Sequence, residues 1–127
     1  MRTFSILSLL LLCCIFCGCN KNVSVTGQIT FPDGSPLTEG NIIFESETFQ
    51  GFSSINKEGR YSLGSIQEGD KVPKGQYKVR IIAVSGGGSD GTPLVRYVAQ
   101  KYESVRTSGL NCDVEGNTEY NITVEKP

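Results

Sequence analysis

The stretch that most constrains the fold is VSVTGQITF, residues 23–31, because its apolar side chains recur at every second position. Val23, Val25, Ile29 and Phe31 fall on one face, and polar side chains occupy the other. A period of two indicates a β-strand with one buried face, because successive side chains point to opposite sides of a sheet. From residue 23 onward we therefore expect half-buried strands.

Turn residues divide the rest of the chain into further short alternating stretches. PDGSP at 32–36 and NKEG at 56–59 contain the residues that favour tight turns, and Gly59 can accept a positive φ. EGNT at 115–118 is predicted to close a hairpin. No convincing helix is expected after residue 20, although 94–102 could form a turn or two. The expected strands are 23–31, 41–46, 49–55, 60–66, 72–84, 108–114 and 119–125.

These seven short strands predict the fold class. Seven strands over about 105 residues are typical of an all-β sandwich with Greek-key connections around one core. The expected domain is 23–127, preceded by an N-terminal signal segment. Tyr77 follows a corner made by Pro73 and Gly75, where a tyrosine can bury its ring and return its hydroxyl to nearby backbone. Cys112 is expected to be a small buried hydrophobe, since it has no basic neighbour to activate it.

The first 18 residues follow a different pattern. Arg2 precedes an apolar run that is closed by small residues, which is the layout of a secretory signal. The run is shorter than the ~20 residues that a membrane-spanning helix needs. Three alternatives remain for its cysteine cluster: a zinc site, a disulfide framework with Cys112, or a secretory signal without lipid. A zinc site favours paired ligands on a folded framework, which the apolar run does not offer.

The segment FCGC at 16–19 resembles a bacterial lipobox. Gly18 and Cys19 match its two most demanding positions, while Phe16 replaces the usual leucine. The resemblance implies that 1–18 is a signal peptide, cut between Gly18 and Cys19, and that Cys19 carries the lipid. Residues 19–22 are then the lipidated cysteine and a short spacer. The asparagine after Cys19 favours the outer membrane over the inner one, because retention at the inner membrane uses an aspartate there.

Three quoted motifs carry a second resemblance. VTGQITFPDGSPLTEGNIIFES, NKEGRYSL and VPKGQYKVRI resemble the carboxypeptidase regulatory-like, or transthyretin-like, β-sandwich domain. The tail at 101–124, with the lipobox, is similar to small planctomycete-type lipoproteins of this fold. The resemblance implies a seven-stranded, prealbumin-like Greek-key sandwich. It implies little about activity, because a fold does not fix a function.

The sequence contains few candidate catalytic residues. The chain has no histidine, which removes the commonest general base and the usual serine and cysteine hydrolase arrangements. Glycine-rich 85–93 lacks the Gly-Lys-Ser/Thr ending of a phosphate loop and is expected to be a flexible loop or a binding loop. We expect no enzyme, no catalytic residue, no cofactor and no metal. A formal net charge of −1 gives no case for nucleic acid as a partner.

Two minor alternatives involve side chains that the sequence leaves far apart. One is a calcium site, and the other is an intramolecular lysine–asparagine isopeptide bond assisted by an acid. The residues are Asp90 with Asp33 or Asp70 for calcium, and Lys78 or Lys21 with Asn121 and Glu45 for the bond.

The expected function follows from the anchor. The leading hypothesis is a non-catalytic, lipid-anchored module of the cell or outer membrane, facing the periplasm or the exterior, with a structural or protein-interaction role. Its partners are the membrane, through the lipid, and an unidentified envelope protein or glycan. The alternative is a carbohydrate-binding module, for which Tyr97, Tyr102 and Phe49 are the available aromatic platforms, although each is expected in the core. An enzyme is the third hypothesis.

Overall fold

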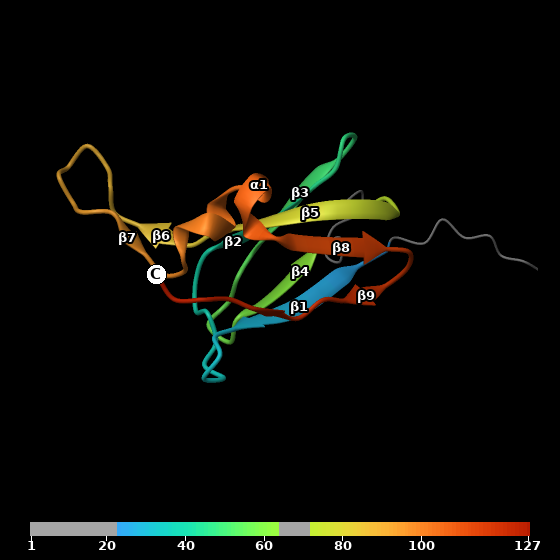
Figure 1. The fold of residues 1–127 in the computed structure, drawn as a ribbon, viewed down its shortest axis with the longest axis horizontal. Helices are drawn as coiled ribbons and strands as arrows, with labels where there is room; N and C mark the ends of the chain where they lie inside the picture. The colour runs from blue at the N-terminus through green and yellow to red at the C-terminus, as the bar shows by residue number, and fades with distance from the viewer. Residues whose placement is uncertain (1–22, 64–71) are drawn as a thin grey trace, which may run out of the picture.

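The computed structural model describes residues 23–63 and 72–127, which form a mostly β structure (Figure 1). The signal segment, the lipobox and the spacer lie outside these residues. The strands are β1 (Val25–Thr30), β2 (Asn41–Glu45), β3 (Gln50–Ser54), β4 (Arg60–Leu63), β5 (Gly75–Ile82), β6 (Val84–Ser85), β7 (Val95–Arg96), β8 (Leu110–Val114), β9 (Thr118–Glu119) and β10 (Ile122–Thr123).

Two four-stranded sheets form the two layers seen in Figure 1. The first has the order β3-β2-β5-β8, and all of its neighbouring strands are antiparallel. In the second, β1 pairs with β4 in antiparallel fashion on one side. On its other side β1 pairs in parallel with β9 and then β10. Strands β6 and β7 form a separate two-stranded ribbon.

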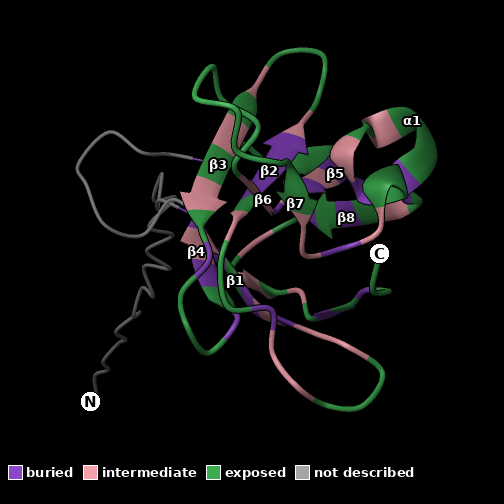
Figure 2. Cartoon of the chain, turned by 90° about the vertical axis from the view of Figure 1, so that its left-hand side faces the viewer, coloured by how far each residue is buried: buried purple, intermediate pink, exposed green. Residues whose placement is uncertain are grey.

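A single hydrophobic core lies between the two sheets. Val25 and Ile29 of β1 meet Phe44 of β2 and Val79 of β5, and all four side chains are fully buried. Figure 2 shows buried positions concentrated on strands that line this space. Each such side chain contributes roughly 1.5–3 kcal/mol on removal from water. In β1 and β5, the period-two pattern therefore correctly predicted which side chains face the core.

The predicted tyrosine corner is confirmed. The Tyr77 ring is buried, and its hydroxyl donates to the Pro73 carbonyl oxygen over 2.6 Å. Burial raises the pKa of this phenol, which keeps it neutral and able to donate. The positive φ expected at Gly59 is also present, at 79°. The Asn56 side chain closes that turn by accepting from the Arg60 amide over 2.9 Å.

The predicted hairpin at 115–118 is wrong. Each of the seven expected ranges contains a strand, but residues 115–117 lead from β8 in one sheet to β9 in the other. The Asn117 side chain accepts a hydrogen bond from the Ser24 amide over 3.0 Å, which fixes the start of the parallel pairing with β1. The turn residues alone therefore did not predict which strand pairs with the residues that follow the turn.

The expectation of no helix needs a small correction. A 3-10 turn, η1 (Gln100–Glu103), precedes a single α-helical turn, α1 (Val105–Ser108). Ser104 caps α1 by accepting from the Arg106 amide over 3.2 Å, and Gly109 ends it with φ of 71°. Both capping residue types were visible in the sequence, but the turn is too short to show an apolar period.

Candidate functional site

The predicted lipidation site lies outside the described residues. Cys19 and Gly18 therefore receive no structural test, and Lys21 and Asp70 are likewise outside. The nearest described residue is Val23, which belongs to the core just before β1 begins. Within 23–63 and 72–127, no helix has the length and apolarity needed to cross a bilayer.

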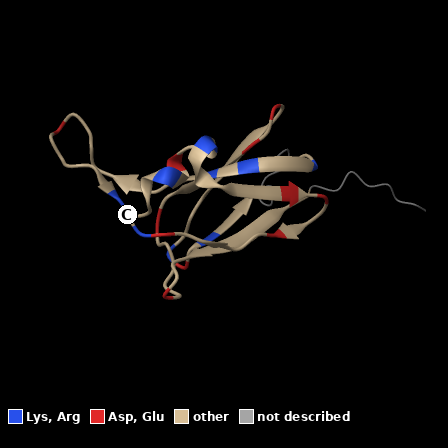
Figure 3. Cartoon of the chain, viewed as in Figure 1, with Lys and Arg blue, Asp and Glu red and all other residues tan. Residues whose placement is uncertain are grey.

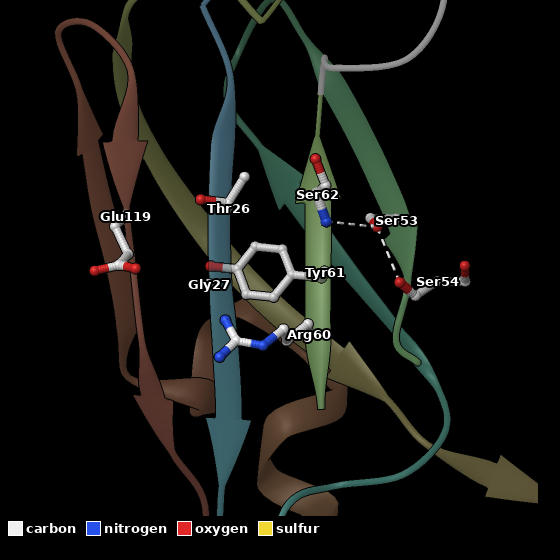
Figure 4. A pocket seen from close by; sticks show the side chains of 8 residues that line it. All are labelled: Thr26, Gly27, Ser53, Ser54, Arg60, Tyr61, Ser62 and Glu119. Atoms are coloured by element: carbon white, nitrogen blue, oxygen red, sulfur yellow. Dashed lines mark hydrogen bonds between the residues drawn. The ribbon is translucent and has the colours of Figure 1, made fainter. Parts of the chain in front are cut away.

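A polar hollow lies on the second sheet, across β9, β1 and β4, and reaches β3 of the first sheet beside β4 (Figure 4). Its volume is about 380 Å³. Most of the side chains that line it carry a hydroxyl or a charge, so polar groups are available along its walls. The lining residues are Thr26, Gly27, Ser53, Ser54, Arg60, Tyr61, Ser62 and Glu119.

Hydrogen bonds hold one wall of this hollow in place. The Ser62 amide donates to the Ser53 hydroxyl over 3.1 Å, which ties β4 to β3 across the two sheets. The same hydroxyl donates to the Ser54 carbonyl oxygen over 2.9 Å. Figure 4 shows this chain of bonds running along one side of the hollow. The Ser53 side chain therefore accepts a hydrogen bond from the backbone of β4 at this border.

Tyr61 is another residue that lines the hollow. Its hydroxyl donates to the Tyr120 carbonyl oxygen over 2.5 Å, and its ring is buried. Gly27 lies beneath this contact, where an added Cβ would overlap the same carbonyl oxygen. Burial, followed by the nearby Cys112 and Tyr120 groups, raises the pKa of Tyr61 well above its ordinary value. Tyr61 is therefore a fixed neutral donor and not a base.

The two charged side chains of the hollow come from different strands. Arg60 lies opposite Gln28 in the β1–β4 ladder, and Glu119 lies beside Thr26 in the β1–β9 ladder. Both are exposed, and neither forms an ion pair with another described residue. A guanidinium, a carboxylate and several hydroxyls can hold a polar ligand by hydrogen bonds. They supply no activated nucleophile.

The aromatic platforms named from the sequence are not open surfaces, as expected. Tyr102 is buried, and its hydroxyl accepts from the Glu125 amide over 3.1 Å. Tyr97 is partly buried against the core, with its hydroxyl 3.1 Å from that of Ser85. The Phe49 ring packs edge-on against Tyr77.

Cys112 is a buried residue, as the alternation predicted. Its exposed fraction is 5%, and it is a free cysteine. Burial, with a smaller contribution from Asp113, raises the pKa of its thiol. A raised pKa lowers the thiolate fraction, and the thiolate is the reactive form. Cys112 therefore contributes to packing.

The calcium alternative finds no support among the described carboxylates. Asp33 accepts from the Ser35 amide and hydroxyl, and Asp90 accepts from the Thr92 amide, so each closes its own turn. These turn hydrogen bonds lower the pKa of both carboxyl groups. Within the described ranges, no three acidic, cysteine or histidine side chains gather at one place.

The sheet topology does not support the isopeptide alternative for the described residues. Lys78 is an exposed residue of β5, directly across the ladder from Glu45 of β2. Asn121 lies between β9 and β10 of the other sheet, where its side chain accepts from the Gln28 amide over 2.9 Å. The core separates the two sheets, so the described lysine and asparagine are not brought together.

The glycine-rich loop 85–93 is shaped by its own hydrogen bonds. The Gly87 amide donates to the Thr92 carbonyl oxygen over 2.8 Å, and Asp90 caps the turn between them. Figure 1 shows the loop projecting at the end of the molecule opposite the start of β1. Basic and acidic residues are distributed over both layers of the described chain (Figure 3).

The sequence reading missed Phe52, which is 72% exposed. The signal was present, because alternation through 49–55 places Phe52 on the polar face with Gln50 and Ser54. It also missed the role of Asn117 and Asn121, whose side-chain oxygens accept from the amides of Ser24 and Gln28. The four-residue spacing of these two asparagines can be interpreted only once β9 and β10 are known to run beside β1.

Comparison with known proteins assigns no family to this chain. No protein-family model matches it, and no curated protein sequence matches it. Among solved structures, the Bacillus anthracis TIE protein aligns with 82% of this chain at a TM-score of 0.49 and 14% sequence identity. This chain spans 16% of the length of that protein. A likeness of this degree carries no argument about function.

Proposed function

We propose that this protein is a lipid-anchored, non-catalytic module of the bacterial envelope with a structural or protein-interaction role. The observation that carries the proposal is the FCGC segment at the end of an apolar run, with Cys19 as the lipid acceptor. Each buried methylene contributes about 0.8 kcal/mol to anchoring, so two or three acyl chains give stable attachment. The membrane is the first partner, at the cell membrane or the outer membrane.

The fold proposed for this module is the seven-stranded Greek-key sandwich of the transthyretin-like type. It is supported by two sheets around one core and by a strand in each of seven expected ranges. In this description β9 and β10 act as one interrupted strand, and β6 continues β5. The tyrosine corner at Tyr77 further supports the assignment, because this device belongs to sandwich folds.

The attachment point would decide which surfaces can meet a partner. Residues 20–22 can span only about 10 Å when extended, so the start of β1 would lie close to the bilayer. The loop 85–93 lies at the other end and would face away from the membrane. Binding segments commonly lie on loops held by a rigid scaffold. This loop is therefore the proposed region for contact with an envelope partner.

Carbohydrate binding is the second candidate, and one observation favours it. The hollow at β1, β4 and β9 offers hydroxyls together with Arg60 and Glu119, groups that can hydrogen-bond to a sugar. A glycan array with purified protein would test it. Binding that is lost in Arg60→Ala and Glu119→Ala, but kept in Tyr97→Ala, would support this candidate over the interaction module.

Metabolic labelling with palmitate tests the anchor. The wild-type chain should incorporate label and fractionate with membranes, and Cys19→Ala should do neither. Cys17→Ala is the matched control, because it removes a neighbouring thiol and leaves the acceptor in place. Globomycin, which blocks the lipoprotein signal peptidase, should leave a heavier precursor by intact mass. Unlabelled, soluble wild-type protein would refute the proposal, and turnover of a substrate by purified protein would refute its non-catalytic part.

A further inference from the structure

Phe52 stands apart from the other large apolar side chains of the described residues. It is 72% exposed, whereas Leu94 and Val95, the other exposed ones, are 46% and 47% exposed. It lies at the centre of β3, the border strand of its sheet, directly across the ladder from Ile43. An exposed aromatic ring at the middle of a border strand is a common feature of contact surfaces.

The backbone of β3 presents free hydrogen-bonding groups at the same place. The Ile55 amide donates to the Gly40 carbonyl oxygen, so the odd-numbered residues of this strand face β2. Because antiparallel strands alternate, the amide and carbonyl groups of Gln50, Phe52 and Ser54 point away from β2. Those of Phe52 make no hydrogen bond with any residue that the structure describes.

The sequence of β3 also lacks the features that usually block strand addition, although β4 contacts this strand at Ser53. Strand β3 reads QGFSS, without a charge, a proline or a bulge in its register with β2. The border of β4 is different, because its outward amides at Arg60 and Ser62 donate to the side chains of Asn56 and Ser53. Strand β8, at the opposite border of the β3 sheet, carries the charged Asp113.

We propose that the β3 border pairs with β3 of a second copy of this chain. The strands run antiparallel about a two-fold axis at Phe52, so that each Phe52 exchanges both backbone hydrogen bonds with its counterpart. Gln50 of each copy then lies opposite Ser54 of the other. The two Phe52 rings meet on one face, as aromatic residues do in directly opposed pairs. Such an interface is isologous and closed.

Charge complementarity selects a second copy as the occupant. Glu47 and Lys57 lie five residues before and five after Phe52, in the turns at the two ends of β3. The same axis therefore brings the turn that contains Glu47 of one copy to the end of the ladder where the turn that contains Lys57 of the other lies, twice. Both side chains are exposed, and neither has an ion-pair partner among the described residues.

The expected association is weak. Pairing of two five-residue strands buries a small surface area, which is in the range of transient protein–protein contacts. Two copies held on one bilayer would meet at a raised effective concentration. The pairing is nevertheless a property of the β3 border and does not depend on the lipid, so failure of the anchor would leave it testable.

Disulfide trapping in the full-length chain tests the pairing. In an antiparallel hydrogen-bonded pair the opposed Cα atoms lie about 5.5 Å apart, within the range that a disulfide bridges. Mild oxidation of Phe52→Cys should give a covalent dimer on a non-reducing gel. Leu94→Cys is the matched control, with the same background cysteines and an exposed site elsewhere, and should stay monomeric. Equal dimer yields, or trapping of a different protein in place of a second copy, would overturn the proposal.

Charge reversal then tests the register. In the Phe52→Cys background, Glu47→Lys should lower the dimer yield several-fold, because it brings two lysines to the same end of the ladder. Adding Lys57→Glu should restore the yield, because each pair is re-formed with its signs exchanged. A loss that the second change does not restore would show that the copies do not meet in this register, and would overturn the proposal.

Discussion

One side of β1 and one side of β3 lack a continuous ladder, and only the first of these two borders is closed from within the chain. Beside β1, the short strands β9 and β10 are interrupted, and the side chains of Asn117 and Asn121 accept from the amides of Ser24 and Gln28. Beside β3, no described side chain serves the outward groups of Phe52. Amide side chains can therefore complete an irregular ladder from within the chain, whereas an uncharged strand without them stays open to pairing.

The largest effect is expected on the closed border, at Gly27. Gly27→Ala should lower the free energy of unfolding by about 3 kcal/mol, because the new Cβ overlaps a backbone oxygen that cannot move aside easily. Gly116→Ala is the control, since a Cβ there meets no atom within 4 Å. Urea denaturation measures both. Equal stabilities would mean that β1 and the Tyr120 segment are not so closely packed.

The next largest effect is expected for Tyr61→Phe. This change should lower the free energy of unfolding by about 1–3 kcal/mol, because the Tyr120 carbonyl oxygen loses its hydrogen-bond donor. The folded-state pKa of Tyr61 is raised above the ordinary value of 10.0. Its contribution is thus complete below pH 10 and is lost as the pH rises beyond, when only the unfolded state ionises. As the pH is raised to 11, the midpoint of unfolding should fall less steeply in Tyr61→Phe than in the wild type. Parallel profiles would contradict this assignment.

A smaller loss is expected at Asn121. Asn121→Ala removes the acceptor for the Gln28 amide and should cost about 1 kcal/mol. Asn121→Asp keeps an acceptor oxygen and should stay close to the wild type. Thermal unfolding of both variants separates the hydrogen bond from the side chain's bulk. If alanine and aspartate had the same effect, the amide would not be closing the border.

The smallest effect on folding is expected on the open border. Phe52→Ser should change the free energy of unfolding by no more than about 0.5 kcal/mol, because the ring is 72% exposed. Urea denaturation at low protein concentration checks this value. A large loss would show that Phe52 belongs to the core, and the contrast between the two borders would then disappear.

Much of the fold could be predicted because alternation is a local property. Which side chains of β1, β5 and β8 face the core follows from period two, and Tyr77 and Cys112 were placed correctly on that basis. The failures depend on distant segments. The 115–117 turn had hairpin residues, yet β1 was a better partner for the returning chain than β8. The polar hollow combines four strands, and no local pattern shows that their side chains meet.

The sequence by itself determined most of the strands and turns, their buried faces and the candidate acceptor at Cys19, because each depends on neighbouring residues. Only the tertiary structure decided which strands pair, that Asn117 and Asn121 complete one border, and that Phe52 stands on an open one. The physical reason is that a hydrogen-bonding group on a strand is satisfied or free according to what packs beside it. That neighbour can lie more than ninety residues away, as Asn121 does from Gln28.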